Sequence, residues 1–308
     1  MQYSVLIGKL DKRNMINYSI IIPHKNCWDL LCRCVSSIPA RSDIEVMIID
    51  DNSTTFFSEE KLHLLYPQLN LKVFCLHESK FAGGARNVGL VNSTGKWLVF
   101  ADADDFFADG AFDIMDNYID SEHDIIFFAH TAVYSDTLET AERLGYRLKY
   151  ISEYVEHKTR KSEDYLRYLN HSPTSKMTRR KIVEENNLKF DEVPAANDAM
   201  FSVTTGYYAR SIDAVNQTVY VATIRRDSIT QTRNKTNDYS RYSVDISLYN
   251  FFRQKGLTHL YPFVTMRCIN ALRHYGVKEF YKYISLAYKH RVNIFLGITR
   301  RYNKKYKY

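Results

Sequence analysis

The first hundred residues alternate short apolar runs with segments of helical periodicity. Four runs are short and almost continuously apolar, as strands buried on both faces are: 18–22, 44–50, 71–76 and 97–101. Apolar residues at helical spacing fill two of the intervals, 26–38 and 82–94, and Gly95 closes the second. This alternation predicts parallel βαβ units with helices on both faces of a sheet.

The rest of the chain is less regular. Its pattern predicts two more strands, 124–134 and 214–224, and two more helices, 161–170 and 197–209. Past about Asn237 the pattern becomes helical, aromatic and basic, and it indicates no further strand. We therefore expect an α/β domain followed by a helical region.

Composition limits the class of protein. A hydrophobic fraction of 45% with 14% aromatic residues supports a packed core and argues against disorder. No run approaches the roughly 18 apolar residues of a membrane span, and the N-terminal residues lack the layout of a signal peptide. Five cysteines without a CxxC pair point to a reducing, cytoplasmic location. A zinc site at Cys27, Cys32 and Cys34 is the alternative to simple packing of these side chains on a helix.

Charge is unevenly distributed along the chain, whose net charge is +7. From Arg273 to Tyr308 there are ten Lys and Arg residues against one acid, Glu279, so the preceding residues are slightly acidic as a group. The basic character therefore belongs to the C-terminal region and not to the α/β domain.

Polar and charged residues follow three of the predicted strands. Pro23, His24 and Lys25 come after the first, Asp50 and Asp51 end the second, and "DADD" follows the fourth. Parallel strands end at one edge of the sheet, where ligands of such folds bind. We therefore expect these groups to converge.

The three acids of "DADD" are Asp102, Asp104 and Asp105. Carboxylates this close repel one another, and a cation such as Mg²⁺ or Mn²⁺, which prefers oxygen ligands and often binds substrate phosphates as well, would relieve that repulsion. A solvated acidic turn is the alternative interpretation.

Two other features favour a nucleotide. Asp50 and Asp51 can accept hydrogen bonds from a base or a ribose, as acids do in other nucleotide-binding α/β folds. Gly83 and Gly84 open a helix with Arg86 one turn later, which is an anion-binding arrangement, although glycines also begin helices for steric reasons. Together with the metal acids, these features predict a nucleoside-diphosphate pocket.

The series "SIIIPHKN", "IIDDNS", "GGARNVGL" and "WLVFADADDFF" resembles the family 2 glycosyltransferases of the GT-A fold, over roughly residues 18 to 235. The resemblance implies nucleotide-sugar contacts from Pro23 and His24, which begin the loop around the base. It also implies contacts from Asp51 with the base, and from Gly84 and Arg86 near the base and phosphates. The pair His24-Lys25 departs from the family, which more often has an aromatic residue followed by a polar one.

The same resemblance assigns roles to the acids. "DAD" corresponds to the DxD motif of the family, with Asp102 near the ribose and Asp104 as the metal ligand. Asp105 would lie next to these two acids without contacting the ligand itself. The catalytic base is usually the Asp of an "ED" pair that opens a helix. In "VPAANDAMFS" Asp198 stands at that position, with Asn197 in place of the Glu.

A later basic segment, "YVATIRRDSITQT", also resembles the family. It implies that Arg225 or Arg226 covers the diphosphate, with Ser228 and Thr230 alongside. A solvated basic turn is the alternative.

The resemblance implies an inverting, metal-dependent transferase. Asp198 would deprotonate a hydroxyl of a glycan or lipid-linked acceptor, and that oxygen would displace the nucleotide in a single step. We expect a UDP-sugar as donor, Mn²⁺ or Mg²⁺ as cofactor, and a role in bacterial surface polysaccharide assembly. The expected organisation is an extension at 1–17, a GT-A domain at 18–236 with nucleotide-sugar and acceptor halves meeting at 130/131, and a helical basic region at 237–308.

Three other classes compete. Haloacid-dehalogenase phosphatases also place DxD after a strand. In those enzymes, however, other residue types follow the motif at the positions of Asp105 and Phe106, and no nucleotide-binding acid is needed earlier in the chain. A sugar nucleotidyltransferase would have a glycine-rich loop after its first strand, and "IIIPHKNCW" has no glycine. A non-catalytic nucleotide-sugar-binding scaffold would be distinguished by failure to turn over a donor.

The basic C-terminal region has two interpretations. Tyr281, Ile284, Tyr288, Val292 and Phe295 recur at helical spacing and predict one apolar face, surrounded by Lys282, Lys289, Arg291, Arg300 and Arg301. That face could pack on the α/β domain. Alternatively, it could attach the protein to the anionic inner face of the cell membrane. No nucleic-acid recognition motif accompanies these charges, so we expect no nucleic-acid partner.

Overall fold

The computed structural model of the chain describes residues 15–142, 145–224 and 234–295. It divides into two compact units. The first comprises Met1–Glu192 and Phe201–Ser228, and the second comprises Val193–Met200 and Ile229–Tyr308. The expected domain boundary after residue 236 stays a prediction.

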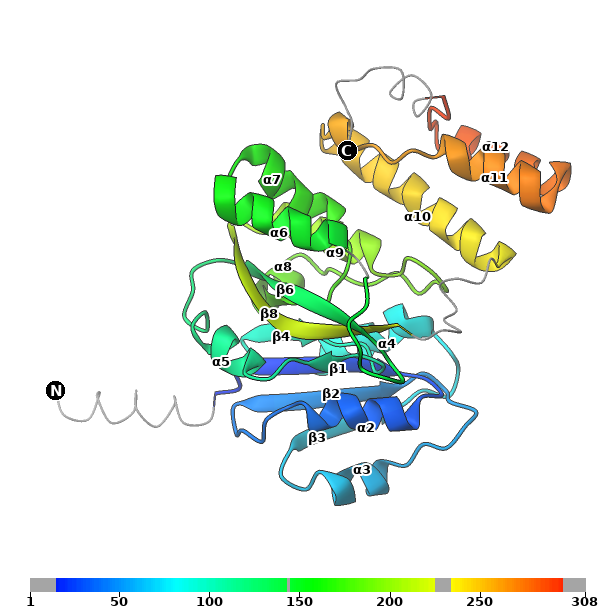
Figure 1. Cartoon of the computed structure of the whole chain (residues 1–308). Coiled ribbons are helices and arrows are strands. Elements are labelled where there is room, and N and C mark those ends of the chain that lie inside the picture. The colour runs from blue at the N-terminus through cyan, green and yellow to red at the C-terminus, as the bar shows by residue number, and fades with distance from the viewer. Residues whose placement is uncertain (1–14, 143–144, 225–233, 296–308) are drawn as a thin grey trace. The chain divides into compact units, whose positions relative to one another are not determined.

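The first unit is built on a sheet of eight strands in the order β3-β2-β1-β4-β7-β6-β8-β5 (Figure 1). The four strands predicted in the first hundred residues are present, and each is parallel to its neighbours among them. They are β1 (Tyr18–His24), β2 (Ile44–Asp50), β3 (Asn70–Cys75) and β4 (Trp97–Phe100). The predicted βαβ half is therefore confirmed.

The other half of the sheet makes it mixed. Its strands are β5 (Phe106–Phe107), β6 (Ile125–Tyr134), β7 (Lys176–Arg179) and β8 (Ile212–Ile224). β7 runs antiparallel to both β4 and β6, so it joins the two halves. Its four residues, KMTR, were not predicted as a strand, because their polar character does not indicate a position in the middle of a sheet.

Helices cover both faces of this sheet (Figure 1). They are α2 (Trp28–Ser36), α3 (Glu59–Leu65), α4 (Phe81–Asn92), α5 (Ala111–Asp116), α6 (Gly145–His157), α7 (Arg160–Asp164), α8 (Arg180–Glu185) and α9 (Ala199–Tyr208). A π-helical turn, η2 (Tyr165–Leu169), continues α7, so the helix predicted at 161–170 is present with this irregularity. The helices α3, α5, α6 and α8 were not predicted.

The core consists of two clusters separated by the sheet. Because successive residues of a strand point to opposite faces, Ile20 and Ile22 of β1 pack under α2, α3 and α5, whereas Ile21 packs under α4. The continuous apolar runs of the sequence follow from this arrangement, since a strand covered on both sides needs apolar residues at every position.

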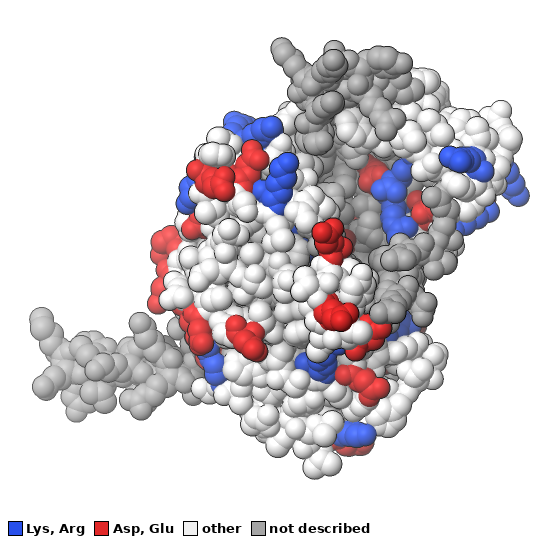
Figure 2. Space-filling model, viewed as in Figure 1, with Lys and Arg blue, Asp and Glu red and all other residues white. Residues whose placement is uncertain are grey.

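The second unit is helical, with α10 (Lys235–Gln254), a 3₁₀ turn η3 (Thr258–Leu260), α11 (Thr265–Tyr275) and α12 (Val277–Lys289). Its own core includes the stacked rings of Tyr242 and Tyr283, whose centroids are 4.4 Å apart. Over residues 234–295 there are ten Lys and Arg residues against three acids, and Figure 2 shows mainly basic side chains on the visible face of these helices. Within the described ranges, none of the helices combines the length and the apolar character that crossing a membrane requires.

The predicted single apolar face near α12 is wrong. Val292 is buried and Ile284 is partly buried in the core of the second unit. Tyr281, Tyr288 and Phe295 are instead 67%, 86% and 63% exposed. The helix therefore carries a packed face and, beside it, an exposed aromatic one; Arg300 and Arg301 lie outside the described residues.

Candidate functional site

The carboxyl ends of β1, β2 and β4 meet at one edge of the sheet. β1 lies between the other two, with His24 opposite Asp50 and Ile21 opposite Phe100. The amide of Asp51 donates to the carbonyl of His24 at 2.8 Å, and the amide of Ala101 donates to that of Ile21 at 3.1 Å. The expected convergence of the three strand ends is therefore confirmed.

His24 lies inside the protein, with 1% of its surface exposed. Its Nδ1 is 2.8 Å from the carboxylate of Asp50, and its Nε2 accepts from the amide of Cys27 at 3.3 Å. An accepting Nε2 requires the proton on Nδ1, so the ring is neutral and donates to Asp50. Burial lowers the pKa of His24 and favours this neutral form. The side chain thus fastens the end of β1 to the end of β2.

Asp51 is also buried, and three groups of the protein bind its carboxylate. The amide of Lys80 and the hydroxyl of Ser79 each donate to it at 2.6 Å, and the ammonium of Lys25 lies at 3.3 Å. These bonds tie the strand end to the loop before α4. Ser79 and Lys80 were not among the predicted site residues, although polar residues before a helix are a recognisable start signal.

Gly84 lies in the first turn of α4, where the backbone approaches other groups closely. A Cβ built on Gly84 would come within 2.3 Å of the Cβ of Lys80. A steric requirement is therefore sufficient to explain this glycine. The absence of a side chain at Gly84 also lets the start of α4 lie close to the loop that holds Asp51.

Arg86 connects α4 to the acidic loop after β4. Its guanidinium donates to the carboxylate of Asp102 at 2.6 Å and lies over the ring of Phe190, 5.3 Å from the centroid. The side chain of Arg86 is nearly buried, whereas that of Asp102 is 41% exposed. A fixed cation beside a partly exposed acid suits a ligand that carries both phosphate and hydroxyl groups.

The loop 102–105 is held by groups from α2 and β8. The carbonyl of Asp104 accepts from Arg33 at 2.8 Å and from the hydroxyl of Thr223 at 2.7 Å. Asp105 is buried and accepts from the amide of Thr223 at 2.7 Å. Burial, with the charges of Asp102 and Asp104, raises the pKa of Asp105 well above its usual range.

The acids of this loop fit a divalent cation only in part. Carboxylate oxygens are the donors that Mg²⁺ and Mn²⁺ prefer. However, Arg86 already binds Asp102, and Asp105 is buried, so Asp104 is the acid best suited to a metal. Among the described residues, no group of three or more His, Cys, Asp or Glu side chains is arranged to hold a metal ion. The remaining ligands would have to come from a diphosphate and water.

The other predicted site residues do not lie on this part of the chain. Asp198 belongs to the second unit and directly precedes α9, partly exposed. Two nearby acids, Asp191 and Glu192, belong to the first unit, where burial raises the pKa of Asp191. The segment with Arg225, Arg226, Ser228 and Thr230 lies outside the described residues.

The cysteines named as an alternative zinc site have ordinary packing roles. Cys34 lies on the buried face of α2, and burial raises the pKa of its thiol. Cys27 and Cys32 are partly buried, and none of the three forms a disulfide. A protonated, buried thiol is a poor metal ligand.

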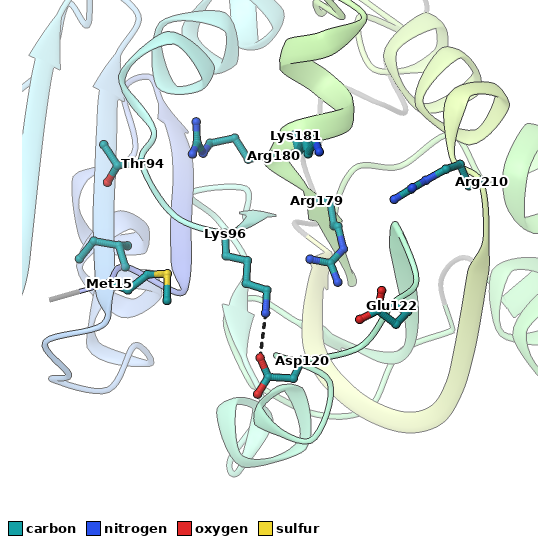
Figure 3. Close-up of a pocket in the computed structure, with 10 residues that line it drawn as sticks. Met15, Thr94, Lys96, Asp120, Glu122, Arg179, Arg180, Lys181 and Arg210 are labelled. Carbon is teal, nitrogen blue, oxygen red and sulfur yellow. Dashed lines mark hydrogen bonds and ion pairs between the residues drawn. The ribbon is translucent and has the colours of Figure 1, made fainter. Parts of the chain in front are cut away.

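A cavity of about 580 Å³ lies at the opposite edge of the sheet (Figure 3). Its lining includes Lys96 directly before β4, Arg180 at the start of α8 and Arg210 before β8. These cations have protein partners: Lys96 binds Asp120 at 2.9 Å, Arg180 binds the carbonyl of Gly95 at 2.9 Å, and Arg210 binds Asp124. The cavity lies where β1 and β4 begin, and it is therefore separate from the candidate site, whose acids follow the carboxyl ends of the strands.

Comparison with known sequences identifies similar proteins. The sequence model described as glycosyl transferase family 2 matches residues 19–186. The putative glycosyltransferase EpsH of Bacillus subtilis is 23% identical over 229 residues, 70% of this chain and 63% of that protein. The poly(ribitol-phosphate) beta-N-acetylglucosaminyltransferase TarS of Staphylococcus aureus is 23% identical over 232 residues, 69% of this chain and 36% of that protein. The chain therefore spans less than two thirds of these relatives.

Solved structures share the fold. A crystal structure of S. aureus TarS 1-349 in complex with UDP-GlcNAc matches 94% of this chain and 76% of that chain, with a TM-score of 0.58 and 18% identity. The mannosyltransferase PcManGT of Pyrobaculum calidifontis, in complex with GDP-Man and Mn²⁺, matches 95% of this chain and 81% of that chain, with a TM-score of 0.60 and 14% identity. The mixed sheet flanked by helices is therefore the GT-A fold predicted from the sequence.

Proposed function

This chain belongs to glycosyl transferase family 2, and from that membership we propose that it transfers a sugar from a nucleotide-diphosphate sugar to a hydroxyl of a glycan or a lipid-linked acceptor. The observation that carries the proposal is the contact of Arg86 with Asp102 at 2.6 Å. It joins the start of α4 to the acidic loop after β4, next to the strand end that carries Asp51.

The donor is proposed to bind along this edge, with Pro23, His24, Asp51, Gly84, Arg86, Asp102 and Asp104 forming its site. Because His24 is buried and neutral, it contributes by holding the loop through its bond to Asp50. Neighbouring residues are proposed to provide the surface that contacts the nucleotide base. The solved structures of TarS and PcManGT are complexes with UDP-GlcNAc and GDP-Man, which supports a nucleotide sugar as the donor. A UDP-sugar is the first to test.

Asp104 is proposed to hold Mn²⁺ or Mg²⁺ together with the phosphates of the donor. A divalent cation bound there would neutralise charge on the departing diphosphate. Arg86 would add a fixed positive charge near the diphosphate. Arg225 or Arg226, in the segment that follows β8 in the sequence, is proposed to add another. The chain then needs no separate acid to protonate the leaving group.

Asp198 is proposed as the base that takes the proton of the acceptor hydroxyl. The freed oxygen attacks the anomeric carbon from the face opposite the nucleotide, so one displacement inverts the configuration. The support is its place in the sequence, directly before α9 and after Asn197. Asp191 is the second candidate, since its burial raises its pKa and makes it a better proton acceptor once ionised.

The acceptor is proposed to belong to a bacterial surface polysaccharide or a lipid-linked glycan, in keeping with the similarity to TarS and EpsH. A cytoplasmic location with peripheral attachment to the inner face of the membrane is proposed for such an acceptor. Its support is the excess of cations and the exposed aromatic residues of α12.

The test is a screen of purified protein against a panel of UDP-, GDP- and TDP-sugars, measuring nucleotide release with Mn²⁺, with Mg²⁺ and with EDTA. We expect one donor to be turned over with metal and not with EDTA. The Asp198→Asn variant should lose about 10²–10⁴-fold in turnover while keeping donor affinity. Binding without turnover of any donor, by wild-type protein supplied with acceptor glycans, would favour the non-catalytic scaffold.

A further inference from the structure

Tyr220 of β8 lies where the hydrogen-bond ladder of β4 ends. The last ladder bond on that side is from the amide of Ala101 to the carbonyl of Ile21. The next amide along the chain, that of Asp102, donates to the hydroxyl of Tyr220 at 2.9 Å. That same hydroxyl bonds to the carboxyl group of Asp105. One phenolic oxygen therefore connects both ends of the loop 102–105.

The ring of Tyr220 has little freedom to move. It is 1% exposed, and its edge meets the ring of Phe107 at a centroid distance of 5.8 Å. The backbone of Tyr220 pairs with Phe107 on one side and with His130 on the other. A hydroxyl on such a fixed ring sets the position of whatever it bonds to.

The local register of β8 brings this side chain to the loop. Phe128 of β6 pairs with Val215, but His130, two residues later, pairs with Tyr220, so β8 contains extra residues in between. A bulge of this kind redirects the side chains that follow it. Beyond the bulge, Tyr220 and Thr223 both bond to the acidic loop.

We propose that Tyr220 is a positioning residue of the transfer reaction, whose hydroxyl holds the backbone of the loop 102–105 so that Asp102 and Asp104 face the bound donor. The proposal rests on the function proposed above. Tyr220 does not touch the donor; it acts through Asp102 and Asp105. Without the hydroxyl, the amide of Asp102 loses its acceptor inside the protein, and the loop can relieve that loss only by moving.

Tyr220→Phe removes the oxygen and leaves the ring. We expect the Kd for UDP in the presence of Mn²⁺, measured by calorimetry, to rise about tenfold or more, since an unsatisfied buried donor costs roughly that much in affinity. Where a donor has been identified, its KM should rise together with a fall in kcat.

Tyr18→Phe is the matched control. Tyr18 is buried in the same core cluster, and its hydroxyl donates to the carboxylate of Asp116 at 2.9 Å, but it belongs to the beginning of β1. Both variants should lose some thermal stability, whereas only Tyr220→Phe should weaken UDP binding. If the two variants bind UDP equally well, Tyr220 is merely structural and the proposal is wrong.

Hydrogen exchange separates this proposal from the proposed function. In the absence of any ligand, amides of 102–105 should exchange faster in Tyr220→Phe than in wild type or Tyr18→Phe, as followed by mass spectrometry. If these amides exchange faster in Tyr220→Phe while the wild-type protein binds neither UDP nor GDP, the result would contradict the proposed donor and still support the role of Tyr220 in holding the loop. Unchanged exchange would contradict the role of Tyr220 whatever the donor.

Discussion

Single residues at the strand ends have two kinds of role. The carboxylates of Asp50 and Asp51 accept hydrogen bonds from the protein itself, and so they hold the strand ends and the loop before α4 in place. Asp102 is bonded to Arg86 and is partly exposed, while the carbonyl of Asp104 is fixed by Arg33 and Thr223. In the sequence all of these acids alike stand at or just after the ends of predicted strands, and only their surroundings in the folded protein distinguish their roles.

Asp104 is the residue whose removal tests the metal. Asp104→Ala should abolish transfer and remove the Mn²⁺-dependent part of UDP affinity, because the proposed ligand is lost. Folding should survive, since one fewer acid in the loop reduces repulsion among carboxylates. The measurements are calorimetric titration of UDP with Mn²⁺ and with EDTA, and thermal unfolding. Asp109→Ala, an exposed acid of the same segment, is the control and should behave as wild type. Full activity of wild-type protein in EDTA would contradict any role for a metal.

His24 makes stability depend on pH. Its pKa in the folded protein lies below the unfolded value of about 6.5, so the unfolded chain binds the extra proton more readily. The free energy of unfolding should therefore be greatest above about pH 6.5 and should fall as the pH drops toward the folded pKa. Each unit by which folding lowers the pKa of His24 contributes about 1.4 kcal/mol to the change in the free energy of unfolding. Urea unfolding between pH 5 and 8 measures this slope. His24→Asn, which can still donate to Asp50, should show a smaller slope over the same range; an equal slope would assign it to other groups.

At the scale of elements, the second half of the first unit depends on close packing that no periodicity predicts. The helix α9 passes directly over the π-helical turn η2. A Cβ built on Gly206 of α9 would be 2.3 Å from the carbonyl oxygen of Arg167, and the Arg167 side chain binds the carbonyls of Gly206 and Ala209 at 2.6 and 2.7 Å. This glycine is required because backbone, and not a movable side chain, lies against it.

Gly206→Ala should therefore destabilise the protein by about 1–3 kcal/mol or more, since the added methyl group forces α9 and η2 apart. The matched control is Gly145→Ala at the start of α6, where nothing lies within 4 Å of the added atom. The control should be neutral or should gain up to about 1 kcal/mol from the reduced freedom of the unfolded chain. Chemical unfolding of both variants provides the comparison. Equal stability of the two would mean that α9 and η2 can separate at little cost.

At the scale of the whole molecule, the chain combines a slightly acidic α/β unit with a basic helical one. On α12, Val277, Tyr281 and Tyr288 are exposed and lie along one side of the helix, with Lys278, Lys282 and Lys289 next to them in sequence. Aromatic residues beside cations are typical of helices that lie on an anionic membrane surface.

Liposome co-sedimentation tests this attachment. Full-length protein should pellet with anionic vesicles at low salt, and less at high salt, because each nearby Lys or Arg contributes about 1 kcal/mol and salt screens that contribution. The double variant Tyr281→Ser/Tyr288→Ser should bind more weakly. Tyr146→Ser, which replaces an exposed tyrosine of α6, is the control and should bind as wild type. Equal pelleting with neutral vesicles, or none with anionic ones, would leave α12 without a membrane role.

The amino-acid sequence by itself determined the parallel half of the sheet, the order of the motifs and their convergence at one edge. These features follow from local rules, since a strand covered on both faces must be apolar throughout and parallel strands end on the same side. Family membership and the GT-A fold could be predicted for the same reason, because the motifs lie at those strand ends.

Only the tertiary structure decided how the rest is arranged. The polar strand β7 is central because β4 and β6 supply its partners, and the apolar residues near α12 divide between two faces because α10 and α11 cover only one. The bond between Asp102 and Tyr220 joins residues 118 positions apart, across a bulge in β8. Such contacts depend on register and packing between distant segments, and no local pattern of residues specifies either.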